Sequence, residues 1–174
     1  MGQTTGKLAY LALGSNVGDR VGNIQHAITL LTDTPEVNLL GGSSFYETEP
    51  LACDPDQPWF VNAVVAVETT LSPHQLLQRC QQVETVMKRE RNPERPYGPR
   101  TLDVDVLFYD RLMLSDDELM VPHPRLHQRA CVLVPLLEIS PNWVHPVLNQ
   151  TITELHQALE NPEEVVLYGT RTLA

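Results

Sequence analysis

The chain has 174 residues, enough for a core of its own, and its 42% apolar and 20% charged residues are ordinary for a globular domain. Its net charge of −10 disfavours bulk binding to nucleic acid or anionic membranes, and no apolar run approaches the roughly 20 residues of a membrane-spanning helix. Three widely spaced cysteines suit neither a disulfide framework nor a zinc site, so we expect a reducing, cytoplasmic location. The length predicts one domain, residues 1–174.

The first half of the sequence predicts strands around one helix. Residues 7–14 are typical of a short buried strand that ends in a glycine turn, and apolar residues at helical spacing follow over 21–31. Residues 37–48 are extended with a break at 41–42, and 49–58 form an irregular, proline-containing loop. Residues 60–70 are apolar on both faces, which predicts a strand at the centre of a sheet.

The next segments complete an alternating pattern. Ser72 as N-cap, Pro73 in the first turn and Gln75 closing a capping box predict the start of a helix, and a strand follows over 103–109. The order strand, helix, strand, strand, helix, strand predicts a ferredoxin-like βαββαβ α+β sandwich, an antiparallel sheet with helices on its faces. We further expect a turn-rich stretch at 121–128, an apolar helix at 130–139, a capped helix near 151–160 and an edge strand at 165–170.

Two aspartates interrupt the otherwise apolar strand at 103–109. Asp103 and Asp105 lie two residues apart, so they share one face of the strand, about 7 Å apart along the backbone. Two like charges about 6 Å apart repel by roughly 3 kcal/mol at an effective dielectric of about 20, so solvation or a cation must offset them. Exposure to solvent is the usual alternative for an isolated D-x-D pattern. The apolar strand and the basic loop before it instead favour Mg²⁺ bound to nucleotide phosphates.

A basic loop precedes these aspartates. Residues 88–100 hold five of the twelve basic residues of the chain, together with three prolines and one glycine that exclude a regular helix or a central strand. Arginine outnumbers lysine four to one there, which favours bidentate phosphate recognition, although a solvated loop without function is the alternative.

Other candidate sites have equally plain structural explanations. The Walker pattern GxxxxGK[ST] is absent, so GSNVGD is interpreted as a glycine turn. His123 and His127 have a zinc-site spacing only on a helix, which Pro124 disfavours, and His123 can instead donate to a phosphate. Phe60 and Asn62 suit a planar heterocycle, although a core phenylalanine beside a satisfied amide is the alternative.

The segments YLALGSN, SSFYETEPL, QPWFVNAVV, GPRTLDVDVL, VPHPR and LVPLLEI occur in this order. They resemble the 6-hydroxymethyl-7,8-dihydropterin pyrophosphokinase family of folate biosynthesis, nearly along the whole chain, and GPRTLDxD followed by VPHP is highly specific. The resemblance implies a monomer that transfers the pyrophosphoryl group of ATP to the hydroxymethyl oxygen of 6-hydroxymethyl-7,8-dihydropterin and releases AMP.

The resemblance also implies roles for individual residues. Asp103 and Asp105 would bind two Mg²⁺ ions, and Arg89 and Arg100 would act with them in catalysis. The positions that would contact the nucleotide are Gln81, Glu84, Arg91, Tyr97, His123 and Arg129. Those that would form the pterin pocket are Thr48, Leu51, Phe60, Asn62 and Cys131. Loops 14–19, 48–58 and 88–100 would close over the substrates.

Several positions depart from the pattern of the family. Cys131 stands where relatives usually have phenylalanine, which removes one aromatic face worth about 0.5–1.5 kcal/mol. Tyr97 replaces a tryptophan, and Glu118 and Met120 replace an arginine and a threonine of some relatives. The departure at Cys131 predicts weaker pterin binding than in typical relatives, with the chemistry intact, whereas Glu118 and Met120 argue against nucleotide contacts from their segment.

Two other functions use the same architecture. One is a non-catalytic ferredoxin-like module that senses nucleotide or pterin, and the other is an RNA-binding sheet. The charge of −10 and the lack of aromatic residues at the expected exposed positions of the sheet disfavour RNA binding. AMP formation that depends on both Mg²⁺ and the reduced pterin separates the enzyme from either module.

Overall fold

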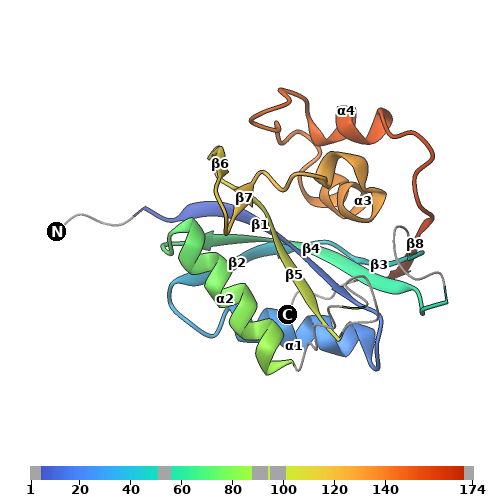
Figure 1. The fold of residues 1–174 in the computed structure, drawn as a ribbon, viewed down its shortest axis with the longest axis horizontal. Coiled ribbons are helices and arrows are strands. Elements are labelled where there is room, and N and C mark those ends of the chain that lie inside the picture. The colour runs from blue at the N-terminus through green and yellow to red at the C-terminus, as the bar shows by residue number, and fades with distance from the viewer. Residues whose placement is uncertain (1–4, 51–55, 88–93, 95–100, 171–174) are drawn as a thin grey trace.

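A computed structural model of the chain describes residues 5–50, 56–87, 94 and 101–170. Its main sheet is antiparallel, with the strand order β5–β1–β4–β3–β8, and β2 pairs with β4 beside this path (Figure 1). The long central strand predicted over 60–70 is therefore confirmed, since β4 pairs with three other strands. The bounds of the strands are β1 Lys7–Ser15, β2 Val37–Gly42, β3 Phe45–Thr48, β4 Phe60–Thr69, β5 Asp103–Tyr109 and β8 Val165–Gly169.

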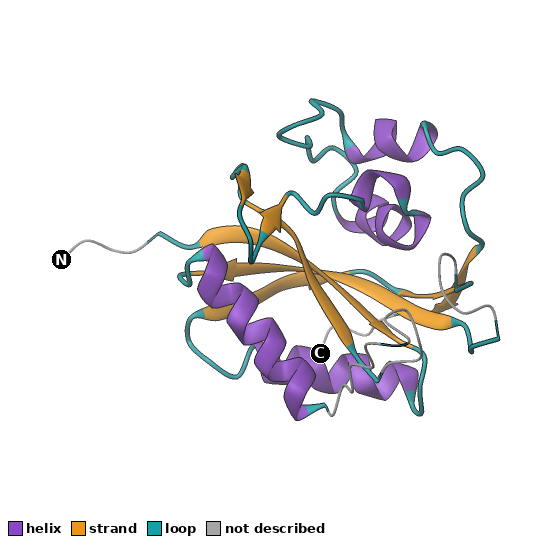
Figure 2. Cartoon of the chain, in the orientation of Figure 1, coloured by secondary structure: helices purple, strands orange, loops and turns teal. Residues whose placement is uncertain are grey.

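Helices cover both faces of this sheet (Figure 2). One layer consists of α1 Arg20–Leu31 and α2 Pro73–Val86, and the other consists of α3 Ala130–Ile139 and α4 Ile152–Gln157. A small hairpin, β6 Leu114–Ser115 and β7 Met120–Val121, and the 3-10 turn η1 Leu126–Gln128 connect β5 to α3. None of the helices in the described ranges is long and apolar enough to span a bilayer.

The order of the elements confirms the predicted βαββαβ core. The segments β2 and β3 together form its second strand, because both pair with β4. The register shifts between Leu39 and Gly41, and the strand is interrupted after Gly42, close to the predicted break. Ser43 bridges the interruption: its backbone N–H donates to the Val64 carbonyl, and its hydroxyl oxygen accepts from the Val64 N–H, both at 2.9 Å.

Alternation along β1 divides the core into two clusters. Leu11 and Leu13 face the layer of α1 and α2, where they join a hydrophobic cluster with Ile24. Tyr10 and Phe108 face the layer of α3 and α4 in a second cluster. Each cluster buries one face of the same sheet, so the two helical layers are fixed relative to its strands.

Local sequence signals set the helix boundaries. The Ser72 hydroxyl accepts from the Gln75 N–H, and the Gln75 side chain accepts from the Ser72 N–H, which confirms the capping box of α2. Thr151 and Glu154 form the same arrangement at α4. The helix predicted over 130–139 is confirmed as α3, with Pro135 inside it, and the predicted edge strand is β8 paired with β3.

Candidate functional site

Two predicted site residues lie in one row across the sheet, on either side of Gly14. Gly14 of β1 pairs with Asn62 of β4 on one side and with Asp103 of β5 on the other. Residues that pair across strands share a face and are about 5 Å apart, so Asn62 and Asp103 are about 10 Å apart. A Cβ atom at Gly14 would lie 2.6 Å from Asn62 Oδ1, so this close row requires glycine.

The two aspartates of β5 are half-buried on the face of the sheet that α3 covers. Asp105 pairs with Ala12 and Asp103 with Gly14, so the neighbouring positions on β1 carry almost no side chain. The space above two small residues suits the ions and phosphate oxygens that a carboxylate pair would hold. Within the described ranges there is no cluster of three or more His, Cys, Asp or Glu that could hold a metal alone. Two carboxylates with substrate phosphates are a usual Mg²⁺ ligand set.

The N-terminus of α3 lies over the same face. Arg129 is its N-cap residue, and Cys131 follows in the first turn. Burial raises the pKa of the Cys131 thiol, and the negative charges of Glu163 and Asp105 raise it further, while Arg129 opposes them. These interactions bring Arg129 and Cys131, predicted for different substrates, into one electrostatic neighbourhood with Asp105.

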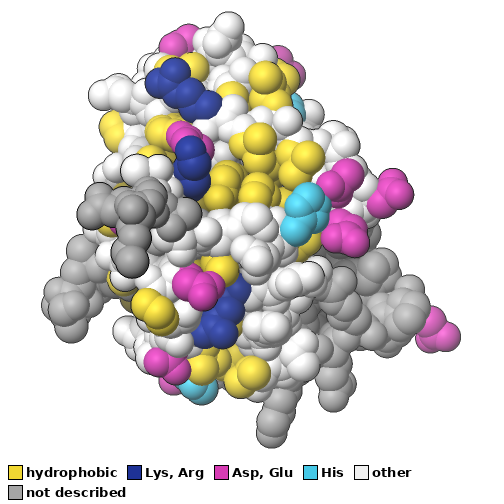
Figure 3. Space-filling model, turned by 90° about the vertical axis from the view of Figure 1, so that its left-hand side faces the viewer, with side chains coloured by type: hydrophobic (Ala, Val, Ile, Leu, Met, Phe, Trp, Pro, Cys, Tyr) yellow, Lys and Arg dark blue, Asp and Glu magenta, His cyan; other side chains and the backbone are white. Residues whose placement is uncertain are grey.

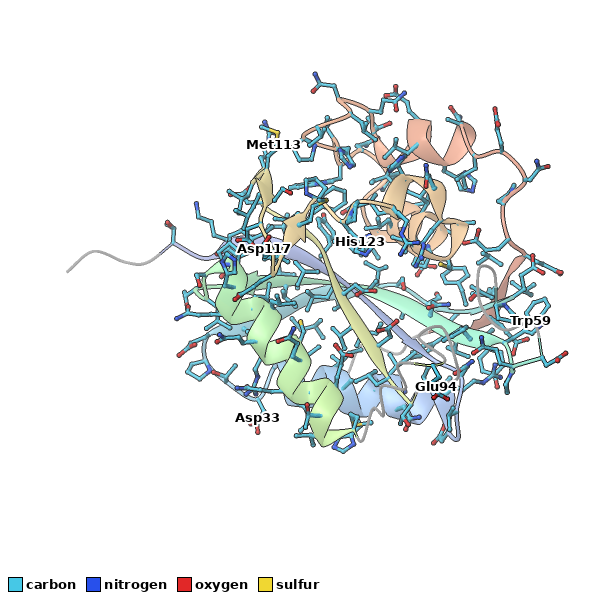
Figure 4. All side chains as sticks on the ribbon, viewed as in Figure 1. Asp33, Trp59, Glu94, Met113, Asp117 and His123 are labelled. Carbon is cyan, nitrogen blue, oxygen red and sulfur yellow. The ribbon has the colours of Figure 1, made fainter. Side chains whose placement is uncertain are left out.

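His123 occupies the turn between β7 and η1, and Figure 4 shows it between the sheet and α3. Burial lowers the pKa of His123 to about 4, aided by the positive charges of Arg129 and Arg125 and opposed by Asp103. The ring is therefore neutral at pH 7. Its Nδ1 accepts from the Arg125 N–H at 3.3 Å, which leaves Nε2–H as a donor, as a phosphate contact requires.

On α2, Glu84 is buried, whereas Gln81 is exposed. Burial raises the pKa of the Cys80 thiol, and the negative charges of Glu84 and Asp105 add to the shift. Glu84 therefore lies in the electrostatic neighbourhood of the acidic pair. Gln81, predicted for the same nucleotide, is at the solvent side of the helix.

Besides Cys131 on α3, the described residues of the predicted pterin pocket lie on β3 and β4. Thr48 is buried and pairs across the strands with Phe60. Asn62 Nδ2 donates to Thr48 Oγ1 at 2.6 Å, so the amide is oriented by a neighbour before any ligand arrives. The structure thus brings Thr48, Phe60 and Asn62 together, as predicted.

The buried side-chain amide of Asn16 binds the residues that lead into β4. Asn16, in the turn after β1, is 2% exposed, and its Nδ2 donates to Gln57 Oε1 at 2.8 Å and to the Pro58 carbonyl at 3.0 Å. The next carbonyl, that of Trp59, accepts from Arg20 Nη1 at 2.9 Å. Two consecutive carbonyls ahead of Phe60 are therefore held from the 14–20 segment.

Arg20 also joins this segment to two strands. Its Nη1 forms an ion pair with Glu47 Oε2 at 2.8 Å, next to Thr48, and its guanidinium lies 5.1 Å from the centre of the Tyr168 ring. The sequence analysis missed Asn16 and Arg20. The only signal was their polar character in a glycine turn, because their partners lie about 40 residues away in sequence.

A cavity of about 400 Å³ lies beside the β6–β7 hairpin. It is mostly apolar and includes His123, but neither Asp103 nor Asp105 lines it. Apolar side chains gather on this face of the molecule, bordered by acidic ones (Figure 3). Some are well exposed, among them Met113, Met120, Val147 and Leu148. The cavity shares the segment around His123 with the candidate site but is separate from the acidic pair.

Several predicted site residues lie outside the described residues. They are Leu51, Arg89, Arg91, Tyr97 and Arg100.

Comparisons with known proteins show which family the sequence matches. A family model described as 7,8-dihydro-6-hydroxymethylpterin-pyrophosphokinase (HPPK) matches residues 10–141. A 2-amino-4-hydroxy-6-hydroxymethyldihydropteridine pyrophosphokinase of Methylorubrum extorquens is 46% identical over 136 residues, which cover 78% of this chain and 84% of the relative. The enzyme of the same name from Bacillus subtilis is 43% identical, over 76% of this chain and 77% of the relative.

The fold also matches solved structures. A Plasmodium falciparum HPPK-DHPS crystal structure superposes with a TM-score of 0.69 at 18% identity. The match covers 90% of this chain but 43% of that longer one, so it concerns the fold of this part alone.

The bonds of Asn16 lead to a test of stability. Asn16→Ala removes the Nδ2 group that donates to the buried Gln57 Oε1 and to the Pro58 carbonyl, so we expect it to lower the free energy of unfolding by about 2 to 3 kcal/mol. Urea denaturation measures this change. Asn142→Ala, at an exposed turn position, is the matched control and should change stability by less than about 0.5 kcal/mol. Equal effects in the two variants would contradict the anchoring role of Asn16.

The lowered pKa of His123 leads to a pH-dependent test. Between pH 6.5 and about 4 the unfolded chain binds a proton at this histidine and the folded chain does not, so stability falls as the pH falls. We expect His123→Gln to lose about 1 to 2 kcal/mol less than the wild type between pH 7.5 and 4.5. Denaturation of the ligand-free chain at both pH values measures the difference, with exposed His26→Gln as the control. An unchanged pH dependence would refute the burial of a neutral ring.

Proposed function

Because the chain belongs to the 7,8-dihydro-6-hydroxymethylpterin-pyrophosphokinase family, we propose that it transfers the pyrophosphoryl group of ATP to 6-hydroxymethyl-7,8-dihydropterin. The reaction is Mg²⁺-dependent, joins the hydroxymethyl oxygen to the β-phosphorus and releases AMP. The observation that carries the proposal is the row Asn62–Gly14–Asp103, which sets a heterocycle-binding amide about 10 Å from a metal-binding carboxylate.

Asp103 and Asp105 would hold two Mg²⁺ ions. Their shared face, their half-buried positions and the small residues opposite them fit this role. When bound, Mg²⁺ would supply positive charge that offsets the negative charge of the transferring group. Because the carboxylates would hold that charge on β5, we propose that the triphosphate binds beside this strand.

Groups around the carboxylates would contact the nucleotide. His123 offers a neutral Nε2–H donor, Arg129 a permanent positive charge, and Glu84 a buried acceptor on α2. The remaining proposed contacts are Gln81, which is exposed, and Arg91 and Tyr97, with Arg89 and Arg100 as proposed catalytic residues.

The pterin would lie between β4 and the N-terminus of α3. Asn62, held by Thr48, presents an amide to the polar edge of the ring, and Phe60 offers an aromatic face. Cys131 closes the pocket from α3, and Leu51 is a further proposed contact. Since phosphoryl transfer relies on positioning and charge stabilisation, no covalent nucleophile is required.

Other expectations stay predictions. A cytoplasmic location and a monomeric state are untested. We further propose that residues 1–174 act as one domain, because both hydrophobic clusters pack on the same sheet.

Removal of either carboxylate charge tests the reaction. Asp103→Asn and Asp105→Asn keep the side-chain shape but lose a ligand for Mg²⁺, so we expect folded proteins with turnover lower by at least about 100-fold. AMP formation from ATP, with and without Mg²⁺ and the dihydropterin, measures it. Asp117→Asn, on the exposed β6–β7 turn, is the control. Normal turnover in both variants would remove the metal assignment, and binding without any wild-type turnover would favour the sensing module.

A second variant tests the pterin wall. Cys131→Phe restores an aromatic face, which we expect to tighten pterin binding by about 2- to 10-fold, since such contacts are worth about 0.5–1.5 kcal/mol. Calorimetric titration with the dihydropterin measures the affinity, and Cys80→Ala, buried on α2, is the cysteine control. Pterin affinity that Cys131→Phe leaves unchanged would show that this position does not limit binding.

A further inference from the structure

We propose that Glu163 is a positioning residue, which fixes the N-terminus of α3 so that Arg129 and Cys131 are in place before the substrates bind. The proposal rests on the proposed function, because it assigns Arg129 to the nucleotide and Cys131 to the pterin. Neither the sequence analysis nor the resemblance singled out Glu163.

The N-terminus of α3 lacks a cap from its own sequence. Arg129, the N-cap residue, makes no side-chain hydrogen bond to the helix, and its first turn holds no acidic residue. Instead, Glu163 Oε1 accepts from the Cys131 N–H at 2.7 Å. Glu163 comes 32 residues later in the chain, so it is a cap supplied by the tertiary fold.

Burial of the Glu163 carboxylate would destabilise the folded state if this hydrogen bond were not made. The residue is 8% exposed, and its charge lies near the thiol that Asp105 also influences. A buried carboxylate needs hydrogen bonds and positive charge. The Cys131 N–H and the positive end of the α3 dipole supply them. Glu163 is thus held in place by the same helix start that it stabilises.

The segment that carries Glu163 is itself fixed to the pterin side of the site. Val165 pairs with Thr48 at the end of β3. The Glu164 N–H donates to Glu49 Oε1 at 2.8 Å, and the Glu49 N–H donates to the Glu164 carbonyl at 3.2 Å. Glu163 therefore connects the end of β3, where Thr48 lies, to the helix start above it.

Cys131 therefore belongs to both parts of this arrangement. Its backbone N–H is fixed by Glu163, while its side chain stands where the resemblance expects an aromatic face of the pterin pocket.

Steady-state kinetics with three variants test the role. Glu163→Leu removes the acceptor, and we expect it to raise the KM of both ATP and the dihydropterin by roughly 5- to 10-fold, with a smaller change in kcat. Glu163→Asp keeps the charge but withdraws the carboxylate, and we expect roughly 2- to 4-fold increases. Glu164→Leu alters the exposed neighbour and should leave both KM values within about twofold of the wild type.

Hydrogen exchange at the Cys131 amide gives a readout independent of turnover. We expect faster exchange there in Glu163→Leu and Glu163→Asp than in the wild type or Glu164→Leu, since the acceptor of this N–H is lost or withdrawn. If Glu163→Leu does not fold, Glu163→Asp carries the test alone.

The outcomes separate the two proposals. A wild type that forms no AMP refutes the proposed function and leaves the exchange comparison valid. An active wild type whose KM values survive in Glu163→Leu, or in Glu163→Asp if only that variant folds, refutes the positioning role alone. Lower thermal stability with unchanged KM and unchanged exchange at Cys131 refutes it equally.

Discussion

Repulsion between Asp103 and Asp105 is the constraint around which the site is built. Two carboxylates about 7 Å apart along one strand face, half-buried under α3, are stable only where positive charge can reach them. Small residues on β1 leave room beside both carboxylates. The start of α3 places Arg129 over the same face of the sheet.

The sequence predicts well whatever depends on neighbours along the chain. Ser72 and Gln75 close a capping box within four residues, and the apolar run at 130–139 forms α3 with the predicted bounds. Alternation along β1 and the first part of β5 determines which side chains face which layer, whereas the register shift at Leu107 places Leu107 and Phe108 in the same cluster. Since these signals are local, they specify the elements and the βαββαβ order without any tertiary contact.

The contacts that hold the site residues in place join segments that are far apart in the sequence. Asn16 and Arg20 hold carbonyls about 40 residues away, and Glu163 caps a helix that begins 33 residues earlier. Each of them binds at least one backbone group, which looks alike in any sequence, and their side-chain partners are also far away in the chain, so no local pattern could single them out. The burial of Glu84 also could not be predicted from the sequence nearby. Its position on the helix is compatible with a solvent-facing stripe as well as with a buried one.

The two proposed substrates need different kinds of binding site, and residues proposed for each lie on different strands of the same sheet. A neutral heterocycle must be recognised by fixed hydrogen bonds and flat apolar faces, and Asn62 lies in a part of the molecule that Asn16 and Arg20 tie down. A triphosphate needs concentrated positive charge on a chain of net charge −10, so we propose that its binding depends on ions at the aspartates and on the arginine-rich residues 88–100. The two proposed subsites meet at Gly14, and the spacing of the paired strands sets the distance between them. A Cβ atom at Gly14 would lie 2.6 Å from Asn62 Oδ1, so a side chain there would displace the amide of the proposed pterin subsite.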